Sequence, residues 1–271
     1  MIVIRLNERL VEVPAGLTVR QLRDQTMPEA DLIVHNGFPL QNDLPLQYGD
    51  TVVLIARERR PSAAELESLL SARHSPGVLE KVKRAAVGVA GLGGLGSAVA
   101  VALARTGVGK LVLADFDLVE PSNLNRQQYF IDQLGSPKTE ALLENLRRIN
   151  PYAEFTPVQQ RVTASNAATV FAACGIVAEC FDDPQSKAEL VQALLRAGKT
   201  VVAASGVAGS GPANAIRTEK KMAKLYVVGD GVSAAAPGRG LMAPRVGIAA
   251  HHQANAILRL LLGEDPCHES D

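Results

Sequence analysis

A run of 20 uncharged residues at 85–104 constrains this chain more than any other segment, because five of them are glycines, four within the hexapeptide GLGGLG at 91–96. Twenty apolar residues are enough to cross a bilayer, but glycine and alanine supply little of the insertion energy that leucine and isoleucine provide. The pattern instead predicts a buried strand at 86–90, a tight turn and a helix at 97–106. Glycines in such a turn let backbone N–H groups and the start of the helix approach a phosphate. We therefore expect a phosphate-binding turn and no membrane span.

The remainder of the chain after residue 85 alternates between short apolar runs and helical segments. Runs that suit buried parallel strands lie at 111–114, 155–158, 176–181, 200–204 and 225–228, with helical segments at 137–149, 163–173 and 184–197. A last helix is expected to open around Pro244 and to be closed by Gly263. This alternation predicts an α/β fold with a doubly wound, Rossmann-like, mostly parallel sheet. We place this domain at 85–265, before a tail at 266–271.

The first 57 residues have a different pattern, that of a small α+β domain. Strands at 2–6, 10–13, 31–36 and 51–56, with a helix at 19–25 capped by Thr18, give the order ββαββ. This order, with LQYGDTVVLI near its end, resembles the ubiquitin-like β-grasp domain, in particular the small sulfur carriers of thiamin synthesis. Such carriers end in a free Gly-Gly carboxylate, whereas this segment continues through Arg57 into a linker at 58–84 with a helix at 62–71. The resemblance implies a docking or regulatory domain and not the activated carrier itself.

Composition limits the partners and the compartment that we expect. The 271 residues carry 28 Lys and Arg against 28 Asp and Glu, so no overall positive field attracts a nucleic acid or an acidic membrane. Three cysteines, at 174, 180 and 267, form no C-x-x-C pair, and the first ten residues lack a basic region followed by an apolar run. The sequence therefore predicts a cytoplasmic protein without disulfides or zinc, and with no nucleic-acid or membrane partner.

An acidic residue follows the glycine turn at the distance typical of nucleotide-binding sheets. The strand after the helix ends at Asp115, 24 residues beyond Gly91, where a carboxylate meets ribose hydroxyls. An NAD or FAD site shares both features, and a purely structural glycine turn is a further alternative.

Two cations further along favour a phosphate ligand other than a dinucleotide. The polar run at 115–128 places Arg126 just after the ribose position, where dehydrogenase chemistry does not require it. Lys138 is expected at the second position of a helix, with Ser136 as N-cap and Pro137 at the first position. A lysine there faces the positive end of the helix, which indicates an anion nearby. Solvated surface cations are the alternative for both residues.

Two acids follow the apolar run at 176–181. Asp183 is expected to cap the next helix, which begins at Pro184. Asp182 has no such task, so it is free to bind a hard cation such as Mg²⁺, which takes one or two carboxylates together with phosphate oxygens. Without a ligand it is an acid at the edge of a sheet.

Together GLGGLG, DFD at 115–117, SNLNRQ at 122–127 and SPK at 136–138 resemble the ThiF/MoeB/HesA superfamily of ubiquitin-activating-enzyme-like adenylyltransferases. The resemblance implies that a homodimer uses ATP to adenylate the C-terminal glycine of a carrier protein. The residues that it places around the nucleotide are Gly91, Gly93, Gly94, Gly96, Asp115, Asp117, Asn123, Arg126, Gln127 and Lys138. It makes Arg126, Lys138 and Asp182 catalytic, with Asp182 on the Mg²⁺ of ATP. An upstream arginine, for which Arg73 is the candidate, is implied to reach the partner subunit's site.

The chain also departs from the superfamily pattern. Most relatives bind zinc through two C-x-x-C pairs and some carry a reactive cysteine after the fifth strand, but the segment 205–240 contains no cysteine. His251 and His252 point about 100° apart on a helix and do not form a same-face metal pair. We therefore assign no catalytic cysteine and no zinc, as in a short zinc-free branch of the superfamily that is linked to thiazole synthesis.

The sequence thus predicts ATP-dependent adenylation of a ubiquitin-like sulfur carrier with a Gly-Gly C-terminus, in thiamin thiazole biosynthesis. Activation of a molybdopterin-type carrier or a tRNA-modifying dehydratase activity would use the same nucleotide site. An NAD-binding oxidoreductase and a non-catalytic ubiquitin-fold adaptor are the alternatives from other classes.

Overall fold

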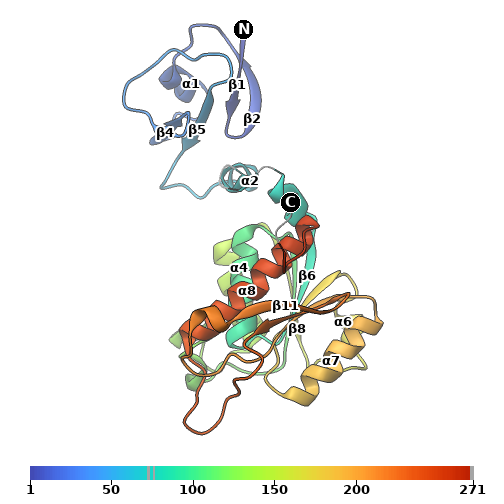
Figure 1. Cartoon of the computed structure of the whole chain (residues 1–271). Coiled ribbons are helices and arrows are strands. Elements are labelled where there is room, and N and C mark those ends of the chain that lie inside the picture. Colours follow the sequence, from blue (N-terminus) through green and yellow to red (C-terminus); the bar gives the residue numbers. More distant parts are fainter. Residues whose placement is uncertain (72–73, 76, 269–271) are drawn as a thin grey trace. The chain divides into compact units, whose positions relative to one another are not determined.

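The computed structural model describes residues 1–71, 74, 75 and 77–268 and is shown in Figure 1. The chain divides into two compact units, Met1–Leu79 and Glu80–Asp271. Helix α2 (Ala63–Ser71) belongs to the first unit, and α3 (Val78–Lys83) spans the division. The predicted domain boundaries stay a prediction, and each unit is described by itself.

Apart from α2, the first unit is a five-stranded sheet with one helix packed on it. Its elements are β1 (Ile2–Leu6), β2 (Arg9–Val13), α1 (Val19–Thr26), β3 (Leu32–His35), β4 (Phe38–Pro39) and β5 (Thr51–Ile55), and the sheet order is β2-β1-β5-β3-β4. Ile4, Val19, Leu22 and Val52 lie in its core. The Oγ1 atom of Thr18 accepts the Gln21 N–H at 3.2 Å, so the predicted helix cap is confirmed. The two-residue strand β4 is too short to give a sequence period and is an addition to the predicted order.

A buried carboxylate organises the turn before β5. The Asp50 side chain accepts hydrogen bonds from the Asn36 side-chain amide and the Gln47 N–H, both at 2.9 Å. The ring of His35 lies 2.9 Å from the same carboxylate. Burial opposes ionisation of Asp50, but these hydrogen bonds outweigh it and lower the pKa of the carboxyl group.

Stability of the first unit should depend on the charge of Asp50. Because its folded pKa is lowered, its contribution is present above the unfolded pKa of about 3.9 and is lost as the pH falls through the folded value. We expect Asp50→Asn to lower the free energy of unfolding by roughly 2 kcal/mol at pH 7. This deficit should shrink in acid below the folded pKa. Hydrogen exchange of the β5 amides under increasing urea measures it, and an equal deficit at neutral and acid pH would contradict the assignment.

The second unit is a seven-stranded sheet with helices on both faces (Figure 1), in the order β11-β12-β10-β9-β6-β7-β8. Its strands are β6 (Ala86–Ala90), β7 (Lys110–Asp115), β8 (Glu154–Gln159), β9 (Ile176–Glu179), β10 (Thr200–Ala204), β11 (Arg217–Met222) and β12 (Leu225–Gly229). Its helices are α4 (Gly94–Thr106), α5 (Lys138–Ile149), α6 (Ala167–Val170), α7 (Pro184–Arg196) and α8 (Ala243–Leu262), with short 3₁₀ helices η1 (Pro121–Asn123), η2 (Ile131–Gln133) and η3 (Ala213–Ala215). β11 runs antiparallel to β12, whereas the other described strand pairs of this sheet are parallel.

The predicted α/β fold with a mostly parallel sheet is confirmed. Helices α4 and α8 pack against each other on one face of the sheet, and α6 and α7 pack together on the other (Figure 1). Helix α8 is closed as predicted by Gly263, which caps its C-terminus with a φ of 84° in the left-handed region that favours glycine.

Two elements differ from the sequence prediction. The helix expected at 163–173 shrinks to α6, because the Asn166 Oδ1 atom accepts the Thr163 N–H at 2.8 Å and draws the preceding residues into a turn. The edge strand β11 has the sequence RTEKKM, whose few apolar residues give no strand period. Its lysines suit an exposed edge, since charged side chains discourage pairing with another strand.

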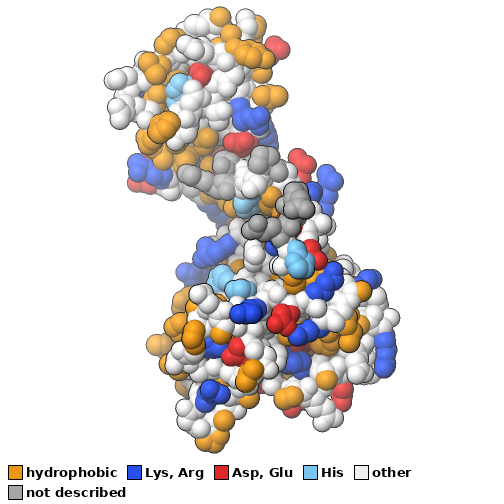
Figure 2. All heavy atoms as spheres, viewed as in Figure 1, with side chains coloured by type: hydrophobic (Ala, Val, Ile, Leu, Met, Phe, Trp, Pro, Cys, Tyr) orange, Lys and Arg blue, Asp and Glu red, His pale blue; other side chains and the backbone are white. Residues whose placement is uncertain are grey.

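The described helices include none that is long and apolar enough to cross a membrane. The uncharged run at 85–104 is divided between β6 and α4. On the visible face of each unit, Lys and Arg side chains are interspersed with Asp and Glu (Figure 2).

Candidate functional site

Three segments singled out by the sequence leave the sheet of the second unit side by side. Ala90, the last residue of β6, pairs with Ala114 of β7 on one side and with Glu179 of β9 on the other. The glycine turn, Asp115 and the acidic turn at 180–183 therefore start at one edge of the sheet. This is the edge at which doubly wound sheets bind their ligands.

The four glycines of the turn have different local roles. Gly91 has a φ of 85°, in the left-handed region. A Cβ atom on Gly96 would lie 1.8 Å from the Gly91 carbonyl oxygen, and one on Gly94 would lie 2.9 Å from Cγ1 of Val246. At Gly93 the nearest atom, Nε2 of Gln127, is 3.9 Å away. Gly91, Gly94 and Gly96 thus let the turn close tightly, whereas Gly93 leaves open space beside the backbone.

Asp115 fixes the glycine turn from the end of β7. Its Oδ2 atom accepts the Leu92 N–H at 2.6 Å and its Oδ1 atom accepts the Asp117 N–H at 2.8 Å. The Tyr129 hydroxyl donates to the Leu92 carbonyl oxygen at 2.7 Å. Burial beside Asp115 and Asp117 raises the pKa of Tyr129, so its hydroxyl stays a donor. An ionised carboxylate has about four lone-pair sites, so Asp115 retains acceptor capacity for a ligand.

The predicted polar run contributes one cation and two buried amides. Arg126 donates from Nη1 to the Asn125 Oδ1 atom at 2.8 Å, and no carboxylate in the described part of the chain pairs with it. Asn123 accepts the Glu120 N–H at 3.2 Å. The Oε1 atom of Gln127 is buried without a hydrogen-bond partner among the described residues. Such an orphaned acceptor is costly unless a ligand donates to it.

Lys138 lies one position earlier in its helix than the sequence predicts. Pro137 is the N-cap and Lys138 is the first residue of α5, so the predicted cap at Ser136 is wrong. The Ser136 carbonyl oxygen accepts the Val119 N–H at 2.9 Å, and Pro137 forms an isolated bridge to the same loop, which keeps this segment extended.

The anion that accompanies Lys138 belongs to the chain itself. The lysine side chain, 7% exposed, donates from Nζ to Oδ2 of Asp117 at 2.9 Å. Asp117 is 47% exposed, so water reaches it and the pair is open on that side. The cost of a lysine at the positive helix end is thus offset by Asp117 in this structure.

The two aspartates of the acidic turn after β9 have different roles. The Oδ2 atom of Asp183 accepts the Ser186 N–H at 2.7 Å, which confirms it as the cap of α7 and lowers its pKa. Asp182 is exposed, and no side chain in the described part of the chain pairs with it.

Three charged residues near the site were not singled out from the sequence. Glu179, 0% exposed, pairs with Lys187 of α7 at 2.5 Å. The Arg161 guanidinium lies 4.3 Å from the centre of the Phe116 ring. Glu179 is the one charged residue of the apolar run at 176–181, and that interruption is the signal that could have found it.

Two cysteines of the second unit, Cys174 and Cys180, are buried. Burial raises the pKa of Cys174 to about 11 and raises that of Cys180 further above its ordinary range. The rings of His251 and His252 face different partners, the Gly247 carbonyl oxygen and the Thr218 hydroxyl. No group of three or more His, Cys, Asp or Glu residues within 1–71, 74, 75 and 77–268 could hold a metal ion. The absence of zinc stays a prediction.

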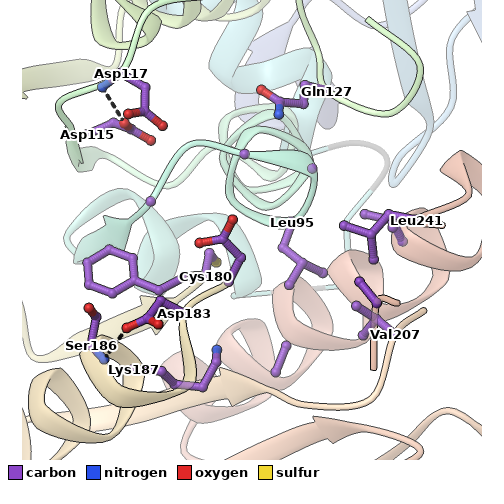
Figure 3. A pocket seen from close by; sticks show the side chains of 18 of the residues that line it. Leu95, Asp115, Asp117, Gln127, Cys180, Asp183, Ser186, Lys187, Val207 and Leu241 are labelled. Atoms are coloured by element: carbon purple, nitrogen blue, oxygen red, sulfur yellow. Dashed lines mark hydrogen bonds between the residues drawn. The ribbon is translucent and has the colours of Figure 1, made fainter. Parts of the chain in front are cut away.

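One cavity of about 800 Å³ within the second unit collects most of the predicted residues (Figure 3). Those that line it are Gly91, Gly93, Gly94, Asp115, Asp117, Asn123, Arg126, Gln127, Lys138 and Asp182. Gly96 is outside the lining, where it packs against the Gly91 carbonyl group. Arg73 lies outside the described residues. In Figure 3 the acids of the two turns lie opposite the apolar side chains of Leu95, Val207 and Leu241.

Two family models match this chain. The ThiF family model matches residues 67–270, and the ThiS-like ubiquitin model matches residues 2–58. The molybdopterin-synthase adenylyltransferase of Salmonella typhimurium is 32% identical over 188 residues, which cover 67% of this chain and 75% of that protein. The adenylyltransferase and sulfurtransferase UBA4 of Eremothecium gossypii is 34% identical over 142 residues, 52% of this chain but only 32% of that longer protein.

Solved structures share the fold of the second unit. The E. coli tRNA N6-threonylcarbamoyladenosine dehydratase in complex with AMP has a TM-score of 0.68 at 24% identity, covering 74% of this chain and 96% of that one. Its complex with ATP has a TM-score of 0.65 at 25% identity, with the same coverage. The family match over residues 67–270, on a sheet whose edge carries the glycine turn and both acidic turns, shows that the chain belongs to the ThiF family, with a ThiS-like ubiquitin domain ahead of it.

Proposed function

We propose that this chain is an adenylyltransferase that uses ATP to adenylate the C-terminal glycine carboxylate of a ubiquitin-like sulfur-carrier protein. The observation that carries the proposal is the cavity itself, which joins an open glycine turn, the cations Arg126 and Lys138 and the exposed carboxylate of Asp182. The molybdopterin-synthase adenylyltransferases of Salmonella typhimurium and E. coli, each matched over about three quarters of its length, support the reaction class.

The cavity suits ATP in size and polarity. Its volume of about 800 Å³ is within the range of small-molecule pockets. The open side of Gly93 and the N–H groups at the start of α4 suit a phosphate group. The unpaired Oε1 atom of Gln127 offers an acceptor for a ligand hydroxyl or amino group. The E. coli dehydratase solved with ATP, at 25% identity, supports this choice of nucleotide.

In our proposal three polar residues of the cavity have defined tasks. Asp115 holds the ribose hydroxyls with the lone pairs that the turn leaves unused. Arg126 and Lys138 neutralise the phosphates. Lys138 shifts its hydrogen bond from the half-exposed Asp117 toward the ligand.

Charge neutralisation and positioning are sufficient for the chemistry that we propose. The attack of a carboxylate on the α-phosphate brings two anions together, so fixed cations reduce the barrier. The attacking carboxylate is already ionised near neutral pH, and no general base is required. This agrees with a cavity whose cysteine, Cys180, is buried with a raised pKa.

Mg²⁺ would be held by Asp182, an exposed carboxylate on the cavity wall. A hard cation prefers carboxylate oxygens and completes its shell with phosphate oxygens and water. The donor fits this ion, and the ion would neutralise charge on the phosphates. We further propose a cytoplasmic homodimer in which Arg73 reaches the partner subunit's site.

The ThiS-like first unit favours a carrier of thiamin thiazole biosynthesis. Isotope exchange between pyrophosphate and ATP, driven by purified carriers, tests this choice. We expect the fastest exchange with a thiazole-pathway carrier and no exchange with the same carrier after removal of its terminal glycine. Faster exchange with a molybdopterin-pathway carrier would move the enzyme to that pathway. Exchange with neither carrier would contradict the reaction itself.

Deleting residues 1–60 should leave the affinity for ATP unchanged within about twofold. Every residue that lines the cavity lies between Gly91 and Val246, inside the second unit. Calorimetric titration of ATP and Mg²⁺ into the truncated and the full chain makes the comparison. Circular dichroism of the truncated protein shows whether it is folded. A folded truncated protein that no longer binds ATP would mean that the first unit contributes to the nucleotide site.

A further inference from the structure

A buried ion pair lies behind the turn that carries Asp182. Glu179, the last residue of β9, has its Oε2 atom 2.5 Å from Nζ of Lys187 on α7. The Oε1 atom of Glu179 accepts the Phe181 N–H at 2.7 Å. Burial raises the pKa of Glu179, and the Lys187 ammonium group and the Phe181 N–H oppose that rise. One carboxylate therefore joins the strand end, the turn and the helix.

Asp182 stands between two clamped residues. Phe181 is held by the Glu179 carboxylate on one side, and Asp183 is held by the Ser186 N–H on the other. The acidic turn at 180–183 also packs against the glycine turn, since a Cβ atom on Gly91 would lie 3.0 Å from the Cys180 carbonyl oxygen. Both neighbours of Asp182 are fixed, while its own carboxylate is left for the cavity.

Lys187 is a potential competitor for Asp182. Its side chain is 21% exposed and it lines the same cavity, only five positions along the chain (Figure 3). A free ammonium group at that place would pair with the nearest carboxylate and repel a cation. Glu179 engages it instead. The backbone of β9 is held without the Glu179 side chain. It pairs with β6 and β10, and the Nε2 atom of Gln253 donates to the Glu179 carbonyl oxygen at 3.1 Å.

We propose that Glu179 is a positioning residue: its carboxylate holds the turn at 180–183 through the Phe181 N–H and engages Lys187, and so keeps Asp182 available for the metal ion that accompanies ATP. The inference rests on the proposed function and adds to it. A buried ion pair commonly contributes little net stability, so a positioning role explains this pair better than a stabilising one. Residues that orient metal ligands typically alter metal affinity 10- to 100-fold when replaced.

The test measures metal binding directly in the full-length protein. Mn²⁺ is titrated in the presence of a non-hydrolysable ATP analogue and the free ion is followed by electron paramagnetic resonance. Glu179→Gln frees Lys187 and should weaken Mn²⁺ binding about tenfold. The affinity for the analogue in metal-free buffer should stay within about twofold, since Glu179 is not in the cavity lining. The double variant Glu179→Gln/Lys187→Met removes the competitor and should recover most of the lost affinity.

The control is Asp230→Asn, which breaks another largely buried ion pair, to Arg245 at 2.6 Å. It should leave Mn²⁺ affinity unchanged, and thermal unfolding of each variant shows that it is folded. An equal loss in Glu179→Gln and Asp230→Asn, or no recovery in the double variant, would overturn the positioning role. If Asp182→Asn kept the wild-type Mn²⁺ affinity, Asp182 would not be the metal ligand. That outcome would contradict the proposed function and not only the positioning role of Glu179.

Discussion

Replacing Lys138 by alanine is expected to lower kcat for carrier adenylation about 10²-fold or more while changing the affinity for ATP much less. The lysine side chain is 7% exposed and lines the cavity from the start of α5, so its ammonium group is itself largely shielded from water. Charge develops on the α-phosphate in the transition state, and a fixed cation stabilises that state more than the bound ground state. Pre-steady-state turnover and calorimetric titration of ATP separate the two effects.

Arg126→Ala should behave in the same way, since Arg126 lines the cavity without a carboxylate partner in the described part of the chain. The matched control is Lys220→Ala. Lys220 also pairs with an aspartate, Asp265 at 3.3 Å, but it lies on β11 outside the cavity lining. Its kcat should stay near the wild-type value. If Lys138→Ala and Arg126→Ala also kept wild-type kcat, neither residue would have the proposed role in the reaction.

The second large effect is expected in the glycine turn, where alanine should prevent or weaken folding at Gly96 but not at Gly93. Gly96→Ala places a methyl group 1.8 Å from the Gly91 carbonyl oxygen, which is backbone and has little room to move. We expect a loss of roughly 3 kcal/mol of stability or failure to fold. Gly93 has a φ of −74°, which alanine adopts readily, and 3.9 Å of free space. Gly93→Ala should therefore fold normally.

The two glycine variants separate structure from binding. The added methyl group of Gly93→Ala occupies the open side of the turn, and we expect it to weaken ATP binding about tenfold or more by blocking close approach to the backbone. Thermal unfolding and calorimetric titration of ATP measure the two properties on the same samples. A Gly93→Ala protein that binds ATP like the wild type would contradict the assignment of this turn to phosphate.

Local patterns made the glycine turn and the sheet predictable. The glycine hexapeptide lies between an apolar run and a helix, and the parallel sheet then brings Asp115 and the acidic turn to the same edge. The role of Asp183 as a helix cap also follows from a stretch of four consecutive residues, in which Pro184 comes directly after Asp183. Such features depend on short segments, which a sequence displays directly.

Features that depend on contacts between distant segments were not predictable. The start of α5 is set by Val119, which bonds the Ser136 carbonyl oxygen and overrides the local capping preference. The partner of Lys138 is Asp117, 21 positions earlier in the chain. The pairing of Glu179 with Lys187 becomes visible only once β9 is known to be buried. The four glycines look alike in sequence, and only the folded turn distinguishes Gly93 from the rest.

The central claim, that the cavity transfers an adenylyl group, is tested most directly by following the α-phosphate of ATP. The protein is incubated with Mg²⁺, a Gly-Gly-ended sulfur carrier and ATP carrying a radioactive label at the α-phosphate. We predict that label appears on the carrier, with pyrophosphate released in equal amount, and that a carrier without its terminal glycine stays unlabelled. Tight binding of NAD, no measurable affinity for ATP and no labelled carrier would contradict the account.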